Sequence, residues 1–226
     1  FTDMPFLVRV EDINGTVQPG RFLNAKDLGR QEEGADFQMV LIDELTNEIV
    51  VPNGTMGERH TNPQKWNLRL ENRDTGAKID PRLSVFDQRE DLTIVKLPYF
   101  GDEEHEGVIE RAIPTITVQT VDGPVKVTTV YDLILANYGI DRGIGGEVAK
   151  AYTDDTPYTP TWQEKITGVK ADIAIATARE FADNAEKTKG RSMIIMGGGI
   201  NHWYHADIIY RTILNLIMFC GTEGVN

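Results

Sequence analysis

Ser192-Met-Ile-Ile-Met-Gly-Gly-Gly-Ile-Asn-His-Trp-Tyr-His205 carries the strongest structural signal in this chain. Four apolar residues, Met193 to Met196, lead directly into three glycines, and a long apolar segment follows His205. In α/β proteins an apolar strand, a glycine-rich turn and a helix often form phosphate and dinucleotide sites, because the glycines admit a ligand close to the backbone and the helix start offers unpaired N–H groups. The stretch therefore predicts an anionic cofactor at this turn.

The sequence on either side of the turn is typical of helices. Thr129, with Asp132 three residues later, forms a capping-box pattern that predicts a helix over residues 130–138. Thr161 and Glu164 repeat the pattern for a short helix that ends at Gly168.

Two further helices are expected over residues 171–186 and about 206–220, and the last is apolar nearly all round, which predicts burial on most sides. From residue 161 the order helix, helix, strand, glycine turn, helix predicts one wall of a Rossmann-like nucleotide-binding layer.

Residues 1–110 form a different kind of sequence, with short β-like runs between turn signals such as Asn14-Gly15. The predicted strands lie at Phe6–Val10, Met39–Ile42, Glu48–Val51 and Leu92–Leu97. Two β-branched runs, Thr115–Thr120 and Val125–Thr129, predict a hairpin around residues 121–124. We therefore expect an α/β fold in two portions, an irregular β-containing portion over residues 1–110 and a Rossmann-like cofactor-binding portion over residues 111–226.

The composition excludes several classes of protein. The 226 residues are 40% hydrophobic and 26% charged, which suffices for a core, and the net charge of −12 argues against nonspecific nucleic-acid binding. Cys220 is the only cysteine, so neither a disulfide framework nor a cysteine-held metal cluster fits within the chain. The longest apolar stretch, Ile208–Cys220, is too short to span a membrane. Because the chain begins at Phe1 without an initiator methionine, we expect a piece of a longer protein.

The glycine triplet also admits a simpler interpretation. It lacks the G-x-G-x-x-G spacing of a dinucleotide fingerprint, and the glycines could serve only to let the strand turn tightly into the helix. Asn201 could likewise cap the helix that follows.

The two histidines of the turn, His202 and His205, are close enough in sequence to share a helical face. A metal site would need a third ligand, for which Asp207 is the only local candidate, so we expect no metal ligand here. A histidine hydrogen-bonded to a cofactor through one ring nitrogen is favoured instead. Trp203 and Tyr204 are expected to be core or rim aromatics.

Elsewhere the structural interpretation is favoured over a functional one. His60, His105 and the acidic run 102–106 are expected at the surface, and Asp154-Asp155 in a loop. Cys220 is expected to pack within its helix. No serine, cysteine or lysine lies in a nucleophile motif, and the sequence contains no P-loop.

Residues 190–205, together with Asn215-Leu-Ile-Met-Phe-Cys-Gly221, closely resemble the catalytic alpha subunits of membrane-bound respiratory nitrate reductases, in the molybdopterin oxidoreductase (DMSO reductase) family. Other blocks resemble those subunits in the same order, and the resemblance covers essentially the whole chain. These blocks are Thr2–Pro5, Pro52–Gly54, Lys65–Leu68, Pro98–Gly101, Thr128–Leu133, Leu135–Gly139 and Ile166–Gly168.

The resemblance implies a molybdenum enzyme with a bis(molybdopterin guanine dinucleotide) cofactor that reduces nitrate to nitrite. Electrons would arrive from membrane quinol through iron–sulfur clusters, including a 4Fe-4S cluster in the parent chain, an iron–sulfur beta subunit and a quinol-oxidising gamma subunit. The complex would lie at the cytoplasmic face of the membrane, or at the outer face in some lineages. This segment alone is expected to be inactive.

Within the segment, the resemblance implies a cofactor-lining role for Gly197, Gly198, Gly199, Asn201, His202 and His205, with His202 as the catalytic candidate. The family's aspartate ligand to molybdenum and its cluster ligands are not found in this sequence. The end of the chain, 221–226, departs from the cysteine-bearing version of better-known members. The alternatives are a relative that reduces another oxyanion, such as selenate or chlorate, and a non-catalytic dinucleotide-binding module. The lack of an acidic residue after a G-x-G-x-x-G turn counts against NAD.

Overall fold

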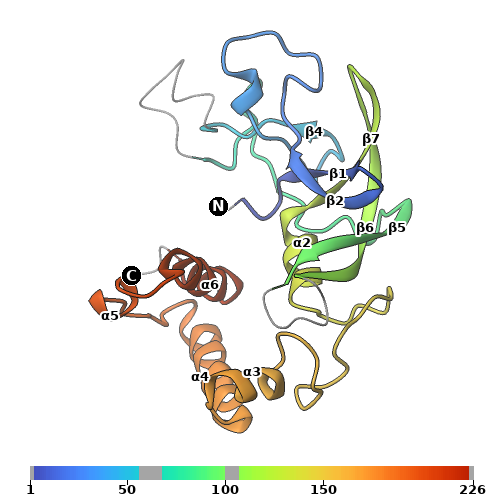
Figure 1. Cartoon of the computed structure of the whole chain (residues 1–226). Coiled ribbons are helices and arrows are strands. Elements are labelled where there is room, and N and C mark those ends of the chain that lie inside the picture. Colours follow the sequence, from blue (N-terminus) through green and yellow to red (C-terminus); the bar gives the residue numbers. More distant parts are fainter. Residues whose placement is uncertain (1–2, 56–67, 100–106, 224–226) are drawn as a thin grey trace. The chain divides into compact units, whose positions relative to one another are not determined.

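A computed structural model describes residues 3–55, 68–99 and 107–223 of the chain and has a mixed α/β fold, which confirms the predicted class (Figure 1). The chain divides into two compact units, unit 1 (Phe1–Lys150) and unit 2 (Ala151–Asn226). The predicted boundary at residue 110, between a β-containing portion and a cofactor-binding portion, stays a prediction. Some sequence predictions lie wholly or partly outside the described residues, namely those for His60, His105, the run 102–106, the blocks at 2–5, 65–68 and 98–101, and the end of the chain at 221–226.

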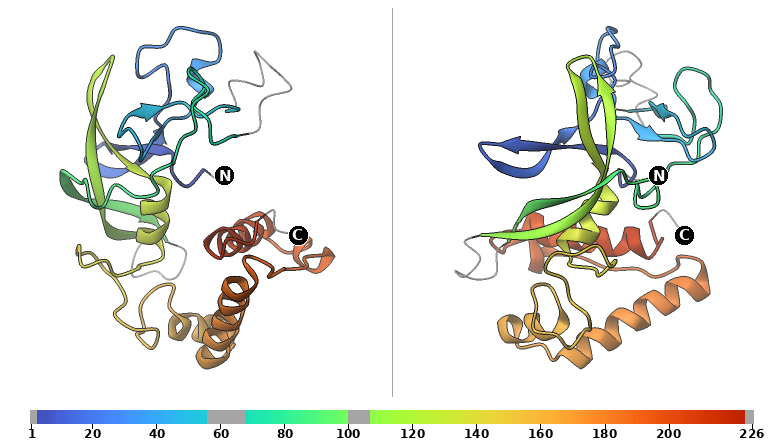
Figure 2. Two further views of the ribbon diagram at one scale, coloured as in Figure 1. Left: turned by 180° about the vertical axis from the view of Figure 1, so that it is seen from behind. Right: turned by 90° about the vertical axis from the view of Figure 1, so that its right-hand side faces the viewer.

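Unit 1 is built on a five-stranded antiparallel sheet of order β2-β1-β7-β6-β5. Its strands are β1 (Leu7–Ile13), β2 (Thr16–Phe22), β5 (Asp91–Pro98), β6 (Val108–Thr120) and β7 (Gly123–Thr129). The sheet curls until its two outer strands, β2 and β5, contact each other (Figure 2). A short helical turn, η1 (Ala35–Phe37), and a two-stranded sheet of β3 (Leu41–Ile42) and β4 (Ile49–Val50) complete the β-rich part.

The residues of the tight turns determine where the hairpins of this sheet form. Asn14 and Gly15 both have positive φ, 56° and 81°, which is the geometry of the tight turns that match strand twist, and they join β1 to β2. The β6–β7 hairpin forms as predicted, with Thr120 opposite Gly123. Strand β2 was not predicted, because Pro19 and Gly20 interrupt its β-like pattern. As an outer strand of the sheet, β2 tolerates a proline that cannot donate to the ladder.

The core of unit 1 lies between the curled sheet and the β3–β4 segment. Its main cluster joins strand residues to loop residues far away in sequence, among them Leu7, Leu23, Val40, Val85 and Val127. Helix α2 (Val130–Asn137) follows β7 directly and begins as the capping pattern predicted, since the Thr129 hydroxyl accepts a 3.1 Å hydrogen bond from the Asp132 backbone N–H.

Unit 2 consists of helices, α3 (Pro160–Thr167), α4 (Ala171–Thr188), α5 (Gly198–Asn201) and α6 (Ala206–Phe219). The predicted helices at 171–186 and 206–220 are confirmed. The predicted start of α3 is wrong by two residues: Thr159 is the N-cap and accepts from the Trp162 N–H at 3.2 Å, whereas the Thr161 hydroxyl donates to the Tyr152 carbonyl. Pro160 explains the difference, because its fixed φ favours the first helical position.

Two expectations for unit 2 are wrong. Residues 193–196 form no strand, and the side chains of Met193 and Ile195 are 78% and 86% exposed. A strand needs a hydrogen-bonded neighbour, and the described part of unit 2 contains only helices. Helix α6 buries none of its residues, although it is apolar on nearly all sides. The apolar pattern thus identifies surfaces suited to burial, and the layer that would cover them is not formed by the described residues of unit 2.

Candidate functional site

All six predicted site residues lie on one short corner of unit 2, between the start of α5 and the start of α6 (Figure 1). Gly197 precedes α5 with extended backbone, and Gly198 and Gly199 open the helix. Asn201 ends α5, and His205 immediately precedes α6. The sequence stretch therefore folds as a helical corner rather than as a strand, turn and helix.

The three glycines have no conformational or steric requirement within the described chain. None of them has a positive φ. A Cβ on Gly197 or Gly199 would meet nothing within 4 Å, and one on Gly198 would meet only the His202 Nε2 atom at 3.9 Å. The simpler interpretation, in which the glycines serve a tight turn, therefore finds no support in the local geometry. The space beside the three Cα atoms is open to a ligand or to another backbone.

Asn201 does not cap α6, because the N-cap position is occupied by His205, which makes no side-chain cap. Instead the Asn201 Oδ1 atom accepts a hydrogen bond from the hydroxyl of Tyr210, in the second turn of α6. Sequence reasoning missed Tyr210. The available signal was its hydroxyl, which follows the apolar pair Ile208-Ile209 in α6.

The two histidines have different backbone geometries. His202 follows α5 with φ −91°, whereas His205 adopts the left-handed conformation with φ 62°. The His205 ring lies 4.1 Å from the Tyr204 ring, centroid to centroid, at 59°. A left-handed conformation strains a residue with a Cβ, and glycine would adopt it more easily than histidine does.

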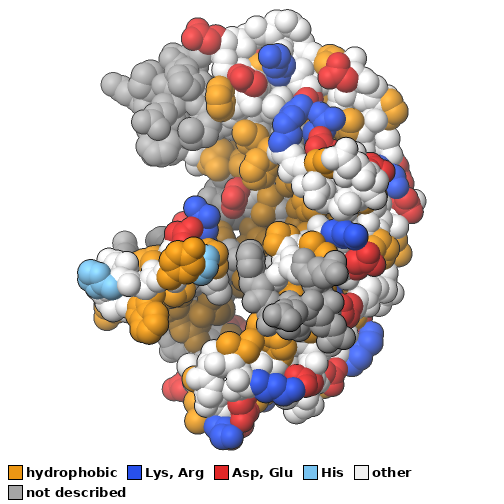
Figure 3. Space-filling model, viewed as in Figure 1, with side chains coloured by type: hydrophobic (Ala, Val, Ile, Leu, Met, Phe, Trp, Pro, Cys, Tyr) orange, Lys and Arg blue, Asp and Glu red, His pale blue; other side chains and the backbone are white. Residues whose placement is uncertain are grey.

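The surroundings of the corner are exposed and apolar. Trp203 and Tyr204 are 72% and 87% exposed, so they are not core residues. Histidine side chains reach the surface beside apolar ones in the space-filling view (Figure 3). Among the described residues no group of three histidine, cysteine, aspartate or glutamate side chains is placed to hold a metal ion. Burial raises the pKa of the Cys220 thiol, as expected for a packed cysteine rather than a nucleophile.

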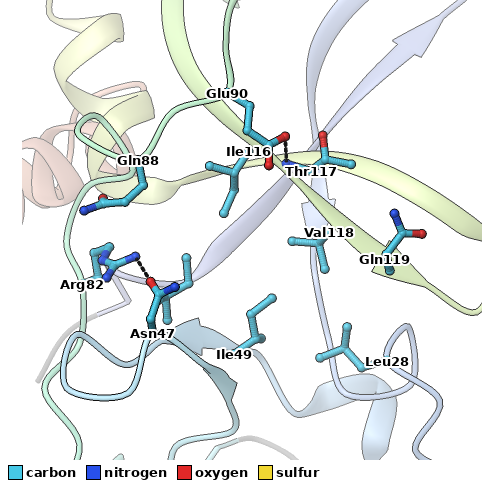
Figure 4. A pocket seen from close by; sticks show the side chains of 11 residues that line it. Leu28, Asn47, Ile49, Arg82, Gln88, Glu90, Ile116, Thr117, Val118 and Gln119 are labelled. Carbon is cyan, nitrogen blue, oxygen red and sulfur yellow. Dashed lines mark hydrogen bonds between the residues drawn. The ribbon is translucent and has the colours of Figure 1, made fainter.

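A separate groove lies in unit 1, with a volume of about 400 Å³ (Figure 4). Apolar side chains such as Ile49, Ile116 and Val118 line it together with polar ones. Its charged groups already have partners: Arg82 donates to Asn47 Oδ1 at 2.8 Å, and Glu90 accepts from the Thr117 N–H at 3.0 Å. None of the six predicted site residues lines this groove, so it does not belong to the candidate site.

None of the described helices is both long enough and apolar enough to cross a membrane.

Comparison with known proteins gives strong and consistent similarities. No family model matches the chain. The chain is 46% identical over 226 residues to the nitrate reductase alpha chain of Bacillus subtilis, with 100% of this chain and 18% of that protein covered. It is 44% identical over 237 residues to the respiratory nitrate reductase 1 alpha chain of Escherichia coli, with 99% and 19% covered. It is also 44% identical over 230 residues to the perchlorate reductase subunit alpha of Dechloromonas aromatica, with 100% and 19% covered.

These similarities agree with the resemblance of the sequence blocks to respiratory nitrate reductase alpha subunits. The chain spans about a fifth of the length of the curated relatives it matches, since 18% and 19% of the first two are covered. The chain belongs to the family of respiratory nitrate reductase alpha chains.

Proposed function

We propose that this chain is part of the catalytic subunit of a molybdenum-dependent, quinol-linked nitrate reductase, and that the corner 197–205 lines its cofactor. The observation that carries the proposal is the 46% identity to a nitrate reductase alpha chain over the entire chain. The open glycine corner adds a structural reason, because nothing else in the described residues requires three glycines there. As the resemblance implies, the residues responsible for metal ligation belong to other parts of the subunit.

The open glycines and the donor chemistry of the corner support a bis(molybdopterin guanine dinucleotide) as its ligand. When bound, this cofactor supplies the molybdenum that takes an oxygen atom from nitrate. The missing side chains at Gly197 and Gly199 let the backbone approach the pyrophosphate or the pterin. Asn201, His202 and His205 supply side-chain N–H donors for the oxygen and nitrogen acceptors of such a ligand.

His202 remains the catalytic candidate, next to the turn and exposed. The strained φ of His205 is an additional reason to assign that side chain a role in the site. Both histidines would orient the ligand through a ring nitrogen and exclude water from it. We assign neither of them to the metal.

The wider proposal follows the same family. The parent protein would also carry a 4Fe-4S cluster and would assemble with an iron–sulfur beta subunit and a quinol-oxidising gamma subunit. It would act at the cytoplasmic face of the membrane. Within the chain, residues 1–110 would supply an irregular β-containing support, and residues 111–226 the cofactor-binding portion.

A second candidate function is the reduction of another oxyanion. The identity to a perchlorate reductase subunit alpha, 44%, equals that to an E. coli nitrate reductase alpha chain, so this segment does not discriminate between the two substrates. A non-catalytic dinucleotide-binding module is disfavoured, because nitrate reductase alpha chains match this chain over its whole length.

The test uses the full-length parent enzyme matured without oxygen. Molybdenum per chain is measured by mass spectrometry beside viologen-linked reduction of nitrate and of perchlorate. About one molybdenum per chain with nitrate turnover supports the proposal, and turnover of perchlorate alone selects the second candidate. Absence of molybdenum from a properly matured preparation contradicts both.

A matched pair of variants tests the corner. Gly199→Ala should lower the molybdenum content without lowering the melting temperature, because the added methyl group meets only open space in this chain. Ala178→Val, which adds methyl groups at an exposed position of α4, should leave the molybdenum content unchanged. Full molybdenum content in Gly199→Ala would remove the corner from the cofactor site.

A further inference from the structure

The hydrogen bond between Tyr210 and Asn201 has a consequence for the chemistry of the corner. The Tyr210 hydroxyl donates to Asn201 Oδ1, which links the second turn of α6 to the last residue of α5. The two residues are nine positions apart, and both belong to unit 2. The tie therefore acts across the bend that contains both histidines.

In the observed orientation of this bond, one end of the Asn201 amide remains available. An asparagine side chain has a carbonyl oxygen that accepts and an NH₂ group that donates twice. In this arrangement the hydroxyl proton of Tyr210 engages the oxygen, so the NH₂ group is turned away from Tyr210. The NH₂ group, for which no acceptor is found among the described residues, is left free, and Asn201 is exposed.

The free donors lie beside the open glycines. Asn201 follows Gly198 by three residues on the same short helix, which places the two positions on one face, and a Cβ on Gly198 would meet only the His202 Nε2 atom at 3.9 Å. A ligand that occupied this space would find two N–H donors with a fixed orientation. Oxygen acceptors, such as those of a pyrophosphate or a pterin carbonyl, are the matching partners.

We propose that Tyr210 is a positioning residue, which holds the Asn201 amide so that its NH₂ group donates to an oxygen of the bound cofactor. The proposal rests on the proposed function of the corner. Tyr210 does not touch the cofactor itself and acts only through Asn201. This positioning role differs from a tie role, in which the hydrogen bond would serve only to hold α5 against α6.

The two roles predict different responses to substitution at Asn201. Asn201→Asp keeps an oxygen acceptor for Tyr210, and so keeps the tie, but it loses both N–H donors and brings a negative charge to an anionic ligand. Under the positioning role, Asn201→Asp should be the most damaging single change, about 10-fold or more in cofactor retention. Under the tie role, it should resemble the wild type.

The experiment uses the full-length holoenzyme and its Tyr210→Phe, Asn201→Asp, Asn201→Leu and Tyr210→Phe/Asn201→Leu variants. The readouts are molybdenum retained per chain after prolonged dialysis, the midpoint potential of the Mo(V) EPR signal, and kcat and KM for nitrate. Tyr210→Phe should lower retention about 3-fold and shift the potential, but should have no further effect in the Asn201→Leu background. Tyr152→Phe, which removes an exposed hydroxyl elsewhere in unit 2, serves as the control and should match the wild type.

The outcomes separate this inference from the proposed function. Additive effects of Tyr210→Phe and Asn201→Leu, or an Asn201→Asp enzyme with normal retention and potential, would overturn the positioning role alone. A wild-type enzyme that holds no molybdenum would overturn the proposed function and the positioning role together. Melting temperatures of each variant identify any loss that arises from misfolding.

Discussion

Gly146 forms an antiparallel bridge with Arg111, so close that a Cβ on Gly146 would lie 2.9 Å from the backbone nitrogen of Ala112. Gly146 also has φ +88°, a conformation that residues with a Cβ rarely adopt. Arg111 itself is 1% exposed, and its Nε donates to the Ala136 carbonyl at 3.0 Å. The loop after α2 is therefore held against β6 by a glycine and a buried arginine.

Gly146→Ala should destabilise the chain by more than about 2 kcal/mol, because it adds a backbone clash to the strain of a positive φ. Gly143→Ala is the matched control: its φ is +71°, but its Cβ would meet nothing within 4 Å. We expect about 1 kcal/mol for that change. Urea unfolding of the two variants measures the difference, and equal losses would show that the bridge is unimportant.

Asp132→Asn should lower the free energy of unfolding by about 3–5 kcal/mol, the usual cost of breaking a buried charge pair. The fully buried carboxylate accepts hydrogen bonds from Arg142 at 2.6 Å, Ser84 at 2.6 Å and the Val85 N–H at 2.9 Å. An amide would turn a donor toward at least one of these donors. Asp87→Asn, at an exposed turn of the same loop, should cost less than about 0.5 kcal/mol by the same unfolding assay.

Acid should weaken unit 1 through Asp27. Burial raises the pKa of this carboxyl, but hydrogen bonds from Arg21 and the Asn24 N–H, with the charges of Arg21 and Arg9, lower it by more, so its pKa lies below the ordinary value. A depressed folded pKa contributes stability above the unfolded value, about 3.9, and loses it as pH falls through the folded pKa.

The measurement is the urea midpoint at pH 6, 4 and 3. Asp27→Asn should be less stable than the wild type at pH 6, and the gap should narrow toward pH 3. Asp87→Asn, at an exposed turn, should follow the wild type at every pH. A constant gap for Asp27→Asn would refute the assignment.

Amide hydrogen exchange on the 226-residue chain should separate the two units. Apart from Ala185, the buried apolar side chains of the described residues lie in unit 1. Exchange protection follows buried apolar contact, so β6 and β7 should exchange far more slowly than α4 and α6. Comparable protection in both units would contradict this expectation.

His205→Gly should stabilise the corner by up to about 1 kcal/mol, because glycine adopts the φ of 62° without strain. In the full-length enzyme the same change should reduce nitrate turnover, since the imidazole is lost. Lys189→Gly is the matched control, because Lys189 has φ 57° at the exposed end of α4. It should give a similar stability gain and unchanged turnover. Full activity in His205→Gly would leave the strain without a functional explanation.

Sequence patterns predicted correctly those features of the fold that depend only on residues close together in sequence. The cap at Thr129, the turn at Asn14-Gly15 and the β6–β7 hairpin each depend on neighbouring residues, and each formed. The strand expected at 193–196 depends on partners distant in sequence, which the described residues of unit 2 do not provide. The tie between Tyr210 and Asn201 could not be predicted for a different reason: the two residues are only nine positions apart, but their contact depends on the angle at which α6 follows α5.

Residues 193–196 also determine how the separated chain behaves in solution. Exposure alternates along them, Met193 and Ile195 are open to water, and no backbone hydrogen bond joins them to another described residue. An apolar, unpaired backbone of this kind is suited to pairing with a second copy, while the net charge of −12 opposes association. Added salt screens that repulsion, so the separated chain should associate as ionic strength rises, and Ile195→Lys should weaken the part of this association that depends on residues 193–196.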